Sequence, residues 1–232
     1  MIPLADLIGG GPLLLDFDGP VCSIFGGYPA PDIAAQLIAL IDRQGIVAPG
    51  EVRSARDPLE VLRWAGEACP AEVTTTIEDA LCVAELRASA TATPTPFSRE
   101  VILGARARGL PIAVVSNNSA AAIEAYLSAH DLAGYISPII GRAYADPLRM
   151  KPHPGPLIAA ARSLNVAPSR CTLVGDSLTD IEAARAANVA VVGYANRPWK
   201  VDAFAGADAV VTSMGDIATV LSPVSPESPE HR

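Results

Sequence analysis

Short apolar runs alternate with amphipathic stretches of helical periodicity over most of this chain, and no other feature constrains its fold as strongly. The runs are continuous rather than alternating, which is typical of strands buried on both faces. Alternation of such strands with helices predicts an α/β fold, a doubly wound (Rossmann-like) parallel sheet covered by helices on both faces. The predicted strands are 13–15, 111–115, 171–174, 189–192 and 209–211, with a sixth candidate at 136–140, and the predicted helices are 98–108, 119–130, 154–164, 179–187 and 215–221.

Residues 22–95 break this rhythm, because they contain no convincing strand and end in the turn-rich sequence TATPTP. Their periodicity predicts three helices, at 31–43, 58–68 and 71–90. We therefore expect an all-helical insert at 22–95, placed after the first strand of a core domain that comprises 1–21 and 96–221. A length of 232 residues suits one domain with a smaller module. The Pro- and Ser-rich residues 222–232 are expected to form a flexible tail.

Composition excludes several classes of function. The formal net charge is -8, no Lys/Arg cluster is present and aromatic residues make up only 5%, so we expect no nucleic-acid partner. The four cysteines lack zinc-ligand spacing and suggest reduced thiols in a cytoplasmic protein. No apolar run reaches 18 residues, so we expect no membrane partner. The sequence leaves the oligomeric state open.

Polar side chains stand where the predicted strands end. Asp16 follows the first strand, Ser116 the second and Asp176 the third, while Lys151 precedes the helix at 154–164. The carboxyl ends of parallel strands share one edge of a sheet, and ligands bind in the crevice there. We therefore expect these four residues to converge although 160 residues separate the first from the last.

The chemistry of such a cluster is restricted. Asp16, Asp18, Asp176 and Asp180 in one cleft would raise each other's pKa unless a cation were present, and oxygen ligands of this kind favour Mg²⁺. A lysine and a hydroxyl beside the carboxylates suit a phosphoryl group. An aspartate can act as a nucleophile, and a second carboxylate nearby can act as acid and then as base.

Four segments resemble the motifs of the haloacid dehalogenase superfamily, in that family's order. They are DFDGPV at 16–21, VVSNNS at 114–119, KPHP at 151–154 and GDSLTD at 175–180. The insert resembles the type-one helical cap of its phosphatase branch, which includes phosphoglycolate phosphatases and β-phosphoglucomutases. The resemblance covers roughly residues 10–215.

The resemblance implies a role for each acidic residue. Asp16 would be the nucleophile and Asp18 the general acid and base. Asp16, the backbone carbonyl of Asp18 and Asp176 would hold Mg²⁺. Asp180 would support the metal waters or the lysine.

The same resemblance assigns the phosphate site. Ser116 and the backbone of Asn117 would bind the phosphate, and Lys151 would neutralise it. Dehalogenases and phosphonate-cleaving members of the family lack an acid two residues after the nucleophile, so Asp18 favours phosphate esters.

The sequence thus predicts a Mg²⁺-dependent phosphatase that hydrolyses a small, soluble phosphate monoester through an aspartyl-phosphate. A sugar phosphomutase of the same superfamily is the first alternative, because the motifs do not separate the two activities. A phosphoaccepting signalling or binding module ranks lower, since it would need neither Asp18 nor a large insert. Among the arginines of the insert, one could contact an anionic end of the substrate; they are Arg43, Arg53, Arg56 and Arg63.

Overall fold

The computed structural model describes residues 3–222 and contains a six-stranded sheet at its centre. All neighbouring strands of this sheet pair in parallel, and Leu14 of the central strand lies between Ala113 and Leu173. The predicted α/β fold class is therefore confirmed. In spatial order the strands are β5 (Ile139–Ile140), β4 (Ile112–Val115), β1 (Leu13–Leu15), β6 (Thr172–Gly175), β7 (Ala190–Tyr194) and β8 (Ala209–Val211).

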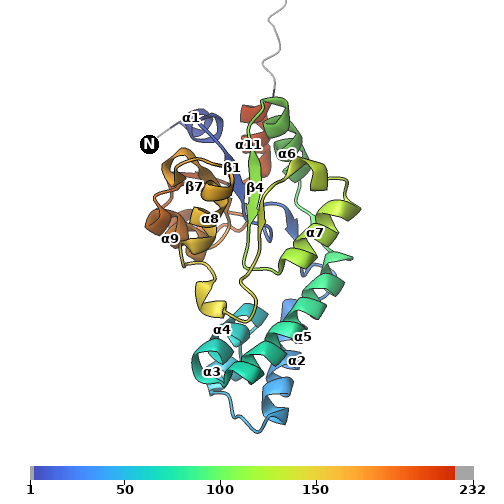
Figure 1. Ribbon diagram of the computed structural model, residues 1–232. Helices are drawn as coiled ribbons and strands as arrows, with labels where there is room; N and C mark the ends of the chain where they lie inside the picture. The colour runs from blue at the N-terminus through green and yellow to red at the C-terminus, as the bar shows by residue number, and fades with distance from the viewer. Residues whose placement is uncertain (1–2, 223–232) are drawn as a thin grey trace, which may run out of the picture.

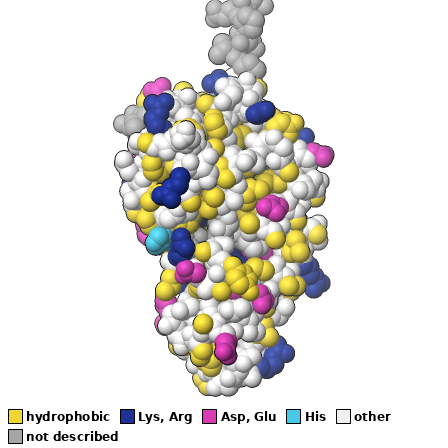
Figure 2. Space-filling model, in the orientation of Figure 1, with side chains coloured by type: hydrophobic (Ala, Val, Ile, Leu, Met, Phe, Trp, Pro, Cys, Tyr) yellow, Lys and Arg dark blue, Asp and Glu magenta, His cyan; other side chains and the backbone are white. Residues whose placement is uncertain are grey.

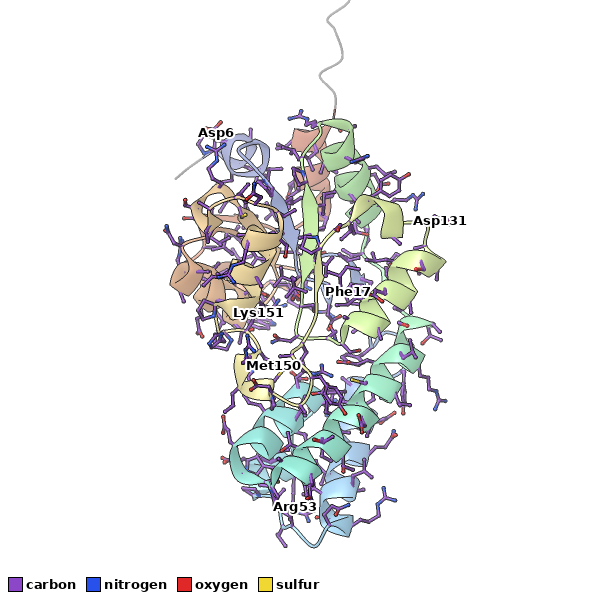
Figure 3. The ribbon with its side chains drawn as sticks, viewed as in Figure 1. Asp6, Phe17, Arg53, Asp131, Met150 and Lys151 are labelled. Carbon is purple, nitrogen blue, oxygen red and sulfur yellow. The ribbon has the colours of Figure 1, made fainter. Side chains whose placement is uncertain are left out.

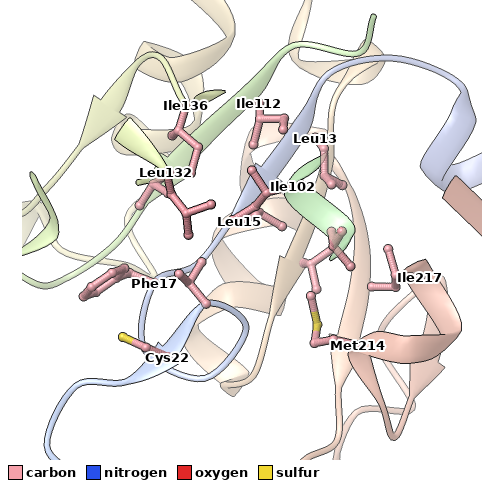
Figure 4. Packing of buried hydrophobic residues seen from close by; sticks show 14 of the residues in the cluster. Leu13, Leu15, Phe17, Cys22, Ile102, Ile112, Leu132, Ile136, Met214 and Ile217 are labelled. Atoms are coloured by element: carbon pink, nitrogen blue, oxygen red, sulfur yellow. The ribbon is translucent and has the colours of Figure 1, made fainter. Parts of the chain in front are cut away.

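Helices cover both faces of the sheet because the strands are apolar on both sides (Figure 1). Successive residues of β1 enter different cores: Leu13 and Leu15 belong to one cluster and Leu14 to the other. Figure 4 shows the first cluster, where Leu13 and Leu15 lie near Ile102 and Met214. That face is covered by α1 (Leu4–Gly9), α6 (Ser98–Ala107), α7 (Ala120–Ala129) and α11 (Met214–Leu221), and the opposite face by α8 (Gly155–Ser163) and α9 (Leu178–Ala187).

The insert is helical and has a core of its own. Its helices are gathered at the end of the molecule opposite the N-terminus, and α5 extends from there to α7 (Figure 1). The apolar side chains of this third cluster come from three of the four helices and include Leu37, Leu62 and Leu81. The helices are α2 (Ala30–Arg43), α3 (Gly50–Arg53), α4 (Pro58–Ala68) and α5 (Ala71–Ser89).

The prediction that residues 22–95 contain no strand is wrong. The two connections between core and insert pair as an antiparallel ribbon of β2 (Cys22–Ser23) and β3 (Thr93–Pro94). Strands of two residues carry no periodic signal, and their partners lie about seventy residues apart in sequence, so local patterns do not predict them.

Other differences are smaller. The strand expected at 136–140 shortens to β5, because Pro138 has no N–H for the ladder. The short helices α1, α3 and α10 (Lys200–Ala203) were not predicted. Of the predicted tail at 222–232, only Ser222 belongs to the described residues. Among the described residues, no helix has both the length and the apolar character needed to cross a membrane.

The central strand should dominate stability. We expect Leu14→Ala to lower the free energy of unfolding by about 2–5 kcal/mol, because Leu14 is fully buried and truncation leaves a cavity. Leu86→Ala on α5 is the matched control: Leu86 is 48% exposed, and its truncation should cost less than about 1 kcal/mol. Urea denaturation followed by circular dichroism measures both. Equal losses in the two variants would contradict this assignment of the core.

Candidate active site

A cavity of about 400 Å³ opens at the carboxyl ends of β1, β4 and β6. It lies at the junction of the core and the insert, where Figure 3 labels Lys151. The structure brings all the predicted site residues to this cavity except Asp180, which lies directly behind Lys151. From the core it is lined by Asp16, Asp18, Ser116, Asn117, Asn118, Lys151, Asp176, Ser177 and Thr179, and from the insert by Asp57, Leu59, Glu60 and Arg63.

A tight turn after β1 presents the first two acids. The Asp16 amide continues the sheet by donating to the carbonyl of Val174 at 2.9 Å. Its Oδ1 accepts from the Phe17 amide at 2.7 Å, while the Phe17 ring is buried beneath the turn. Gly19 closes the turn with a φ of +106°, and a Cβ there would lie 2.4 Å from the carboxyl carbon of Asp176. Only glycine therefore allows the turn to pack against Asp176.

Lys151 is buried between two carboxylates. Its Nζ lies 3.0 Å from Asp16 Oδ1 and 2.5 Å from Asp180 Oδ1, and it donates to the carbonyl of Val115 at 3.0 Å. Burial lowers the pKa of this ammonium, but the carboxylates of Asp16 and Asp180 raise it more, so Lys151 stays charged. The lysine is thereby fixed as a cation at the floor of the cavity.

Asp180 acts through Lys151 and the start of α9. Its Oδ2 accepts from the amide of Ser177 at 3.0 Å and from the Ser177 hydroxyl at 2.6 Å. The Asp180 amide donates in turn to Ser177 Oγ at 3.2 Å, which completes a capping box. Its Oδ1 is occupied by Lys151. Both oxygens are thus engaged within the protein, which matches a supporting role better than that of a direct metal ligand.

Burial perturbs the two acids of the turn. It raises the pKa of Asp18 to about 7, partly offset by the Ile24 amide, which donates to Asp18 Oδ1 at 3.0 Å. Burial also raises the pKa of Asp16, and the carboxylate of Asp180 adds to the effect while Lys151 opposes it. An acid that titrates near neutrality can both give and take a proton, so Asp18 suits acid–base work.

Asp176 has partners that the sequence did not suggest. Lys200 Nζ contacts its Oδ2 at 2.7 Å and its backbone carbonyl at 2.6 Å, and Asn196 Nδ2 donates to the same Oδ2 at 2.9 Å. Both residues follow β7, the next strand along the edge that carries the site. Because both residues follow a predicted strand, their position in the sequence could have indicated that they lie near the site.

The loop after β4 connects the phosphate-site candidates to Lys151. Ser116 Oγ lies 3.2 Å from Asn118 Oδ1. The side chain of Asn117 accepts from the amide of Lys151 at 2.8 Å and donates to its carbonyl at 3.2 Å. The insert reaches the same segment, since Arg63 Nη2 donates to the Lys151 carbonyl at 3.1 Å. Of the four arginines noted in the sequence, Arg63 is the one that lines the cavity.

The carboxylates fit a cation with oxygen ligands. Asp16, Asp176 and Asp180 each offer an oxygen within 4.8 Å of the others. Hydrogen bonds among the described residues leave Asp16 Oδ2 and Asp176 Oδ1 without a donor, whereas both oxygens of Asp180 are used. Two free carboxylate oxygens in one cleft suit Mg²⁺, which usually takes one or two carboxylates and keeps several waters. On the face in Figure 2, by contrast, Lys and Arg side chains are scattered rather than gathered.

Removing one member of the buried cluster should be costly. We expect Asp180→Asn to lower the free energy of unfolding by about 3–5 kcal/mol, because it weakens the compensation of a buried ammonium. The control is Asp42→Asn, which breaks the Arg53–Asp42 pair with side chains 42% and 40% exposed; it should cost about 1 kcal/mol or less. Denaturant unfolding compares them. An Asp180→Asn loss as small as that of the control would refute the interpretation.

Comparison with known proteins identifies the family of this chain. A family model described as haloacid dehalogenase-like hydrolase matches residues 14–188. The phosphoglycolate phosphatase of Escherichia coli is 35% identical over 139 residues, which cover 59% of this chain and 54% of that protein, so the match spans about half of its length. The phosphoglycolate phosphatase of Pectobacterium atrosepticum is 29% identical over 238 residues, with 98% and 99% covered.

Solved structures support the fold. A putative phosphoglycolate phosphatase from Lactobacillus plantarum superimposes with a TM-score of 0.68 at 18% identity, covering 90% of this chain and 98% of that one. CbbY from Rhodobacter sphaeroides, in complex with phosphate, gives a TM-score of 0.65 at 19% identity, with 88% and 95% covered. The family model covers most of the chain, including all four motifs at the sheet edge. This protein belongs to the haloacid dehalogenase-like hydrolases.

Proposed function

We propose that this protein is a Mg²⁺-dependent phosphatase that hydrolyses a small phosphate monoester through an aspartyl-phosphate at Asp16. One observation carries the proposal: the Asp16 carboxylate lies 3.0 Å from the buried ammonium of Lys151, inside a cavity that also contains Asp18. A nucleophile, a fixed cation and an acid that titrates near neutrality thus occupy one cleft.

Mg²⁺ would be held by Asp16, Asp176 and the backbone carbonyl of Asp18. The free oxygens of the two carboxylates and the acidity of the cleft support this assignment. When bound, the ion neutralises the carboxylates and the charge that develops on the phosphoryl group. Lys200 and Asn196 orient Asp176 by holding its other oxygen, Oδ2.

The reaction proceeds in two displacements at phosphorus. Asp16 forms a bond to phosphorus as the ester P–O bond breaks, and protonated Asp18 gives its proton to the leaving alkoxide. Asp18, now a carboxylate, takes a proton from water, which attacks the aspartyl-phosphate and releases inorganic phosphate. Ser116, the amide of Asn117 and Lys151 hold the phosphate oxygens during both steps.

The insert would act as the cap and select the leaving group. We propose that residues 22–95 form this cap domain over the core of 1–21 and 96–221. The cap supplies Asp57, Glu60 and Arg63 to a cavity of about 400 Å³, which restricts the substrate to a small molecule. Arg63 could pair with a carboxylate, so phosphoglycolate, the substrate in the names of the relatives, is the first compound to test.

Activity should depend on Asp16 and on the metal. With p-nitrophenyl phosphate, we expect turnover in Mg²⁺, loss of turnover in EDTA and recovery when Mg²⁺ is returned. Asp16→Asn should reduce kcat by at least about 10³-fold, because the amide is a poor nucleophile. Asp32→Asn, an exchange on helix α2 of the insert, is the control and should keep wild-type kcat. Turnover that survives both EDTA and Asp16→Asn would overturn the mechanism.

Phosphate release separates hydrolysis from transfer. A phosphatase liberates one inorganic phosphate for each ester consumed, whereas a phosphomutase returns the phosphoryl group to a sugar phosphate. We expect stoichiometric phosphate from phosphoglycolate, measured with a malachite green assay. Conversion of a sugar phosphate to its isomer without phosphate release would instead establish the mutase activity.

Arg63 should discriminate among leaving groups. We expect Arg63→Ala to raise KM for phosphoglycolate by about tenfold or more, because one charge-assisted hydrogen bond is lost. KM for p-nitrophenyl phosphate, which has no second anionic group, should change much less. Arg43→Ala is the matched control, since Arg43 lies outside this cavity. An equal rise in KM for both substrates would show that Arg63 does not bind the leaving group.

A further inference from the structure

A buried group of charged side chains joins the insert to the core outside the cavity. Arg142 follows β5 at the edge of the sheet, and Glu78 and Glu85 lie seven residues apart on α5. The side chains of all three are at most 1% exposed. Charges buried this deeply are costly unless each is paired, so their arrangement requires a physical reason.

The guanidinium of Arg142 is shared between both glutamates and a backbone carbonyl. Its Nε and Nη2 donate to Glu78 at 2.9 and 2.8 Å, and its Nη1 donates to Glu85 Oε1 at 2.9 Å. Nη1 also donates to the backbone carbonyl of Asn117 at 2.6 Å. Burial lowers the pKa of Arg142, but the carboxylates of Glu85 and Glu78 raise it by more, so the guanidinium stays charged. One cation thus binds the insert and the loop after β4 together.

Glu85 differs from Glu78 in what else it contacts. Besides Arg142, Glu85 accepts from Asn118 Nδ2 at 3.1 Å and from the amide of Ser119 at 3.0 Å. Asn118 in turn lies beside Ser116, with its amide 3.3 Å from Ser116 Oγ. Among the described residues, the side chain of Glu78 forms hydrogen bonds only with Arg142 and the thiol of Cys82. Glu85 therefore acts on the loop directly, and Glu78 acts only through Arg142.

The backbone requires this close approach as well. The amide of Arg142 donates to the carbonyl of Asn118 at 2.9 Å, and that of Ser116 donates to Ile140 at 2.9 Å. At Gly141, a Cβ would lie 2.5 Å from the amide nitrogen of Ala120, so only glycine lets the two segments run side by side. The loop 116–119 is thus held between β5 and helix α5.

We infer that Arg142 and Glu85 are positioning residues for phosphate binding, through which helix α5 of the insert sets the geometry of the loop 116–119. The inference rests on the proposed function, because it takes Ser116 and Asn117 as the phosphate ligands. In this interpretation, helix α5 is a fixed support for the phosphate site. The leaving-group side of the insert is then formed by α4 and its N-terminal residues Asp57 and Glu60.

Two charge-preserving variants test the inference. Glu85→Asp and Glu78→Asp each shorten a buried carboxylate on the same helix by one methylene. Isothermal titration calorimetry with inorganic phosphate in Mg²⁺ should give a Kd about tenfold higher for Glu85→Asp, which loses contacts to the loop, and less than about threefold higher for Glu78→Asp. Arg142→Lys should resemble Glu85→Asp, because an ammonium lacks the fork that reaches Asn117.

Steady-state kinetics distinguishes a role in positioning the phosphate-binding loop from a role in stability alone. In Glu85→Asp, KM for p-nitrophenyl phosphate and for phosphoglycolate should rise by the same factor, because the phosphate group is common to both. Equal thermal destabilisation of the two Asp variants, with Kd and both KM values unchanged, would overturn the inference. If Glu85→Asp fails to fold, Asn118→Ala breaks the amide link without burying a charge, and its phosphate Kd must rise.

The wild-type protein distinguishes the two proposals. Turnover and phosphate binding by the wild type, with wild-type Kd in folded Glu85→Asp, would contradict only the positioning role. Absence of both turnover and phosphate binding in the wild type would contradict the proposed function and this inference together. Arg185→Lys, in the Arg185–Asp208 pair on the surface of the core, is the control for arginine exchange and should leave Kd unchanged.

Discussion

The ammonium of Lys151 is the interaction on which the arrangement of the site depends. It is buried on the floor of the cavity and lies within 3.0 Å of Asp16 and 2.5 Å of Asp180. Three segments meet there, because Asp16 follows β1, Asp180 lies in the first turn of α9 and Val115, whose carbonyl accepts from Lys151, ends β4. A buried cation is stable only while its carboxylate partners stay in place, so this one contact fixes the spacing of three elements.

The environment of Lys151 also shows how core and insert are combined. Arg63 from the insert donates to the Lys151 carbonyl, and Asn117 from the loop after β4 binds its amide. The insert is therefore attached near the site at two points: α4 through Arg63, and α5 through Glu85 and the neighbouring loop. The β2–β3 ribbon adds the covalent connection. The insert therefore contacts both the entrance of the cavity, through α4, and the loop at its floor, through α5.

The sequence predicted those parts of the molecule that follow from local pattern. The buried strands gave the parallel sheet, and the strand ends gave Asp16, Ser116 and Asp176, since a parallel sheet brings its carboxyl ends to one edge. The β2–β3 ribbon escaped prediction, because its pairing is between segments distant in sequence.

Arg142 and Lys200 were also not predicted, although Lys200 follows a predicted strand. Each is an ordinary charged residue in the sequence and acquires its role only from a partner at least 24 residues away. Their ion pairs with distant carboxylates, and not their residue type, distinguish them from other charged residues. Long-range charge pairs of this kind leave no periodic trace along the chain, whereas a motif such as GDSLTD does.

The charges around the cavity are compatible with the proposed phosphate ester, although the protein as a whole is acidic. The core contributes four carboxylates, from Asp16, Asp18, Asp176 and Asp180, and the ammonium groups of Lys151 and Lys200 pair with all of them except Asp18. The insert adds the side chains of Asp57, Glu60 and Arg63. When the six core groups are all ionised, they retain two negative charges, which a divalent cation would balance. A phosphate dianion would be repelled by the cleft without that ion and attracted once it is bound. The overall charge of -8 therefore does not oppose binding of the proposed substrate, because the charges nearest to the phosphate determine the electrostatic potential at the site.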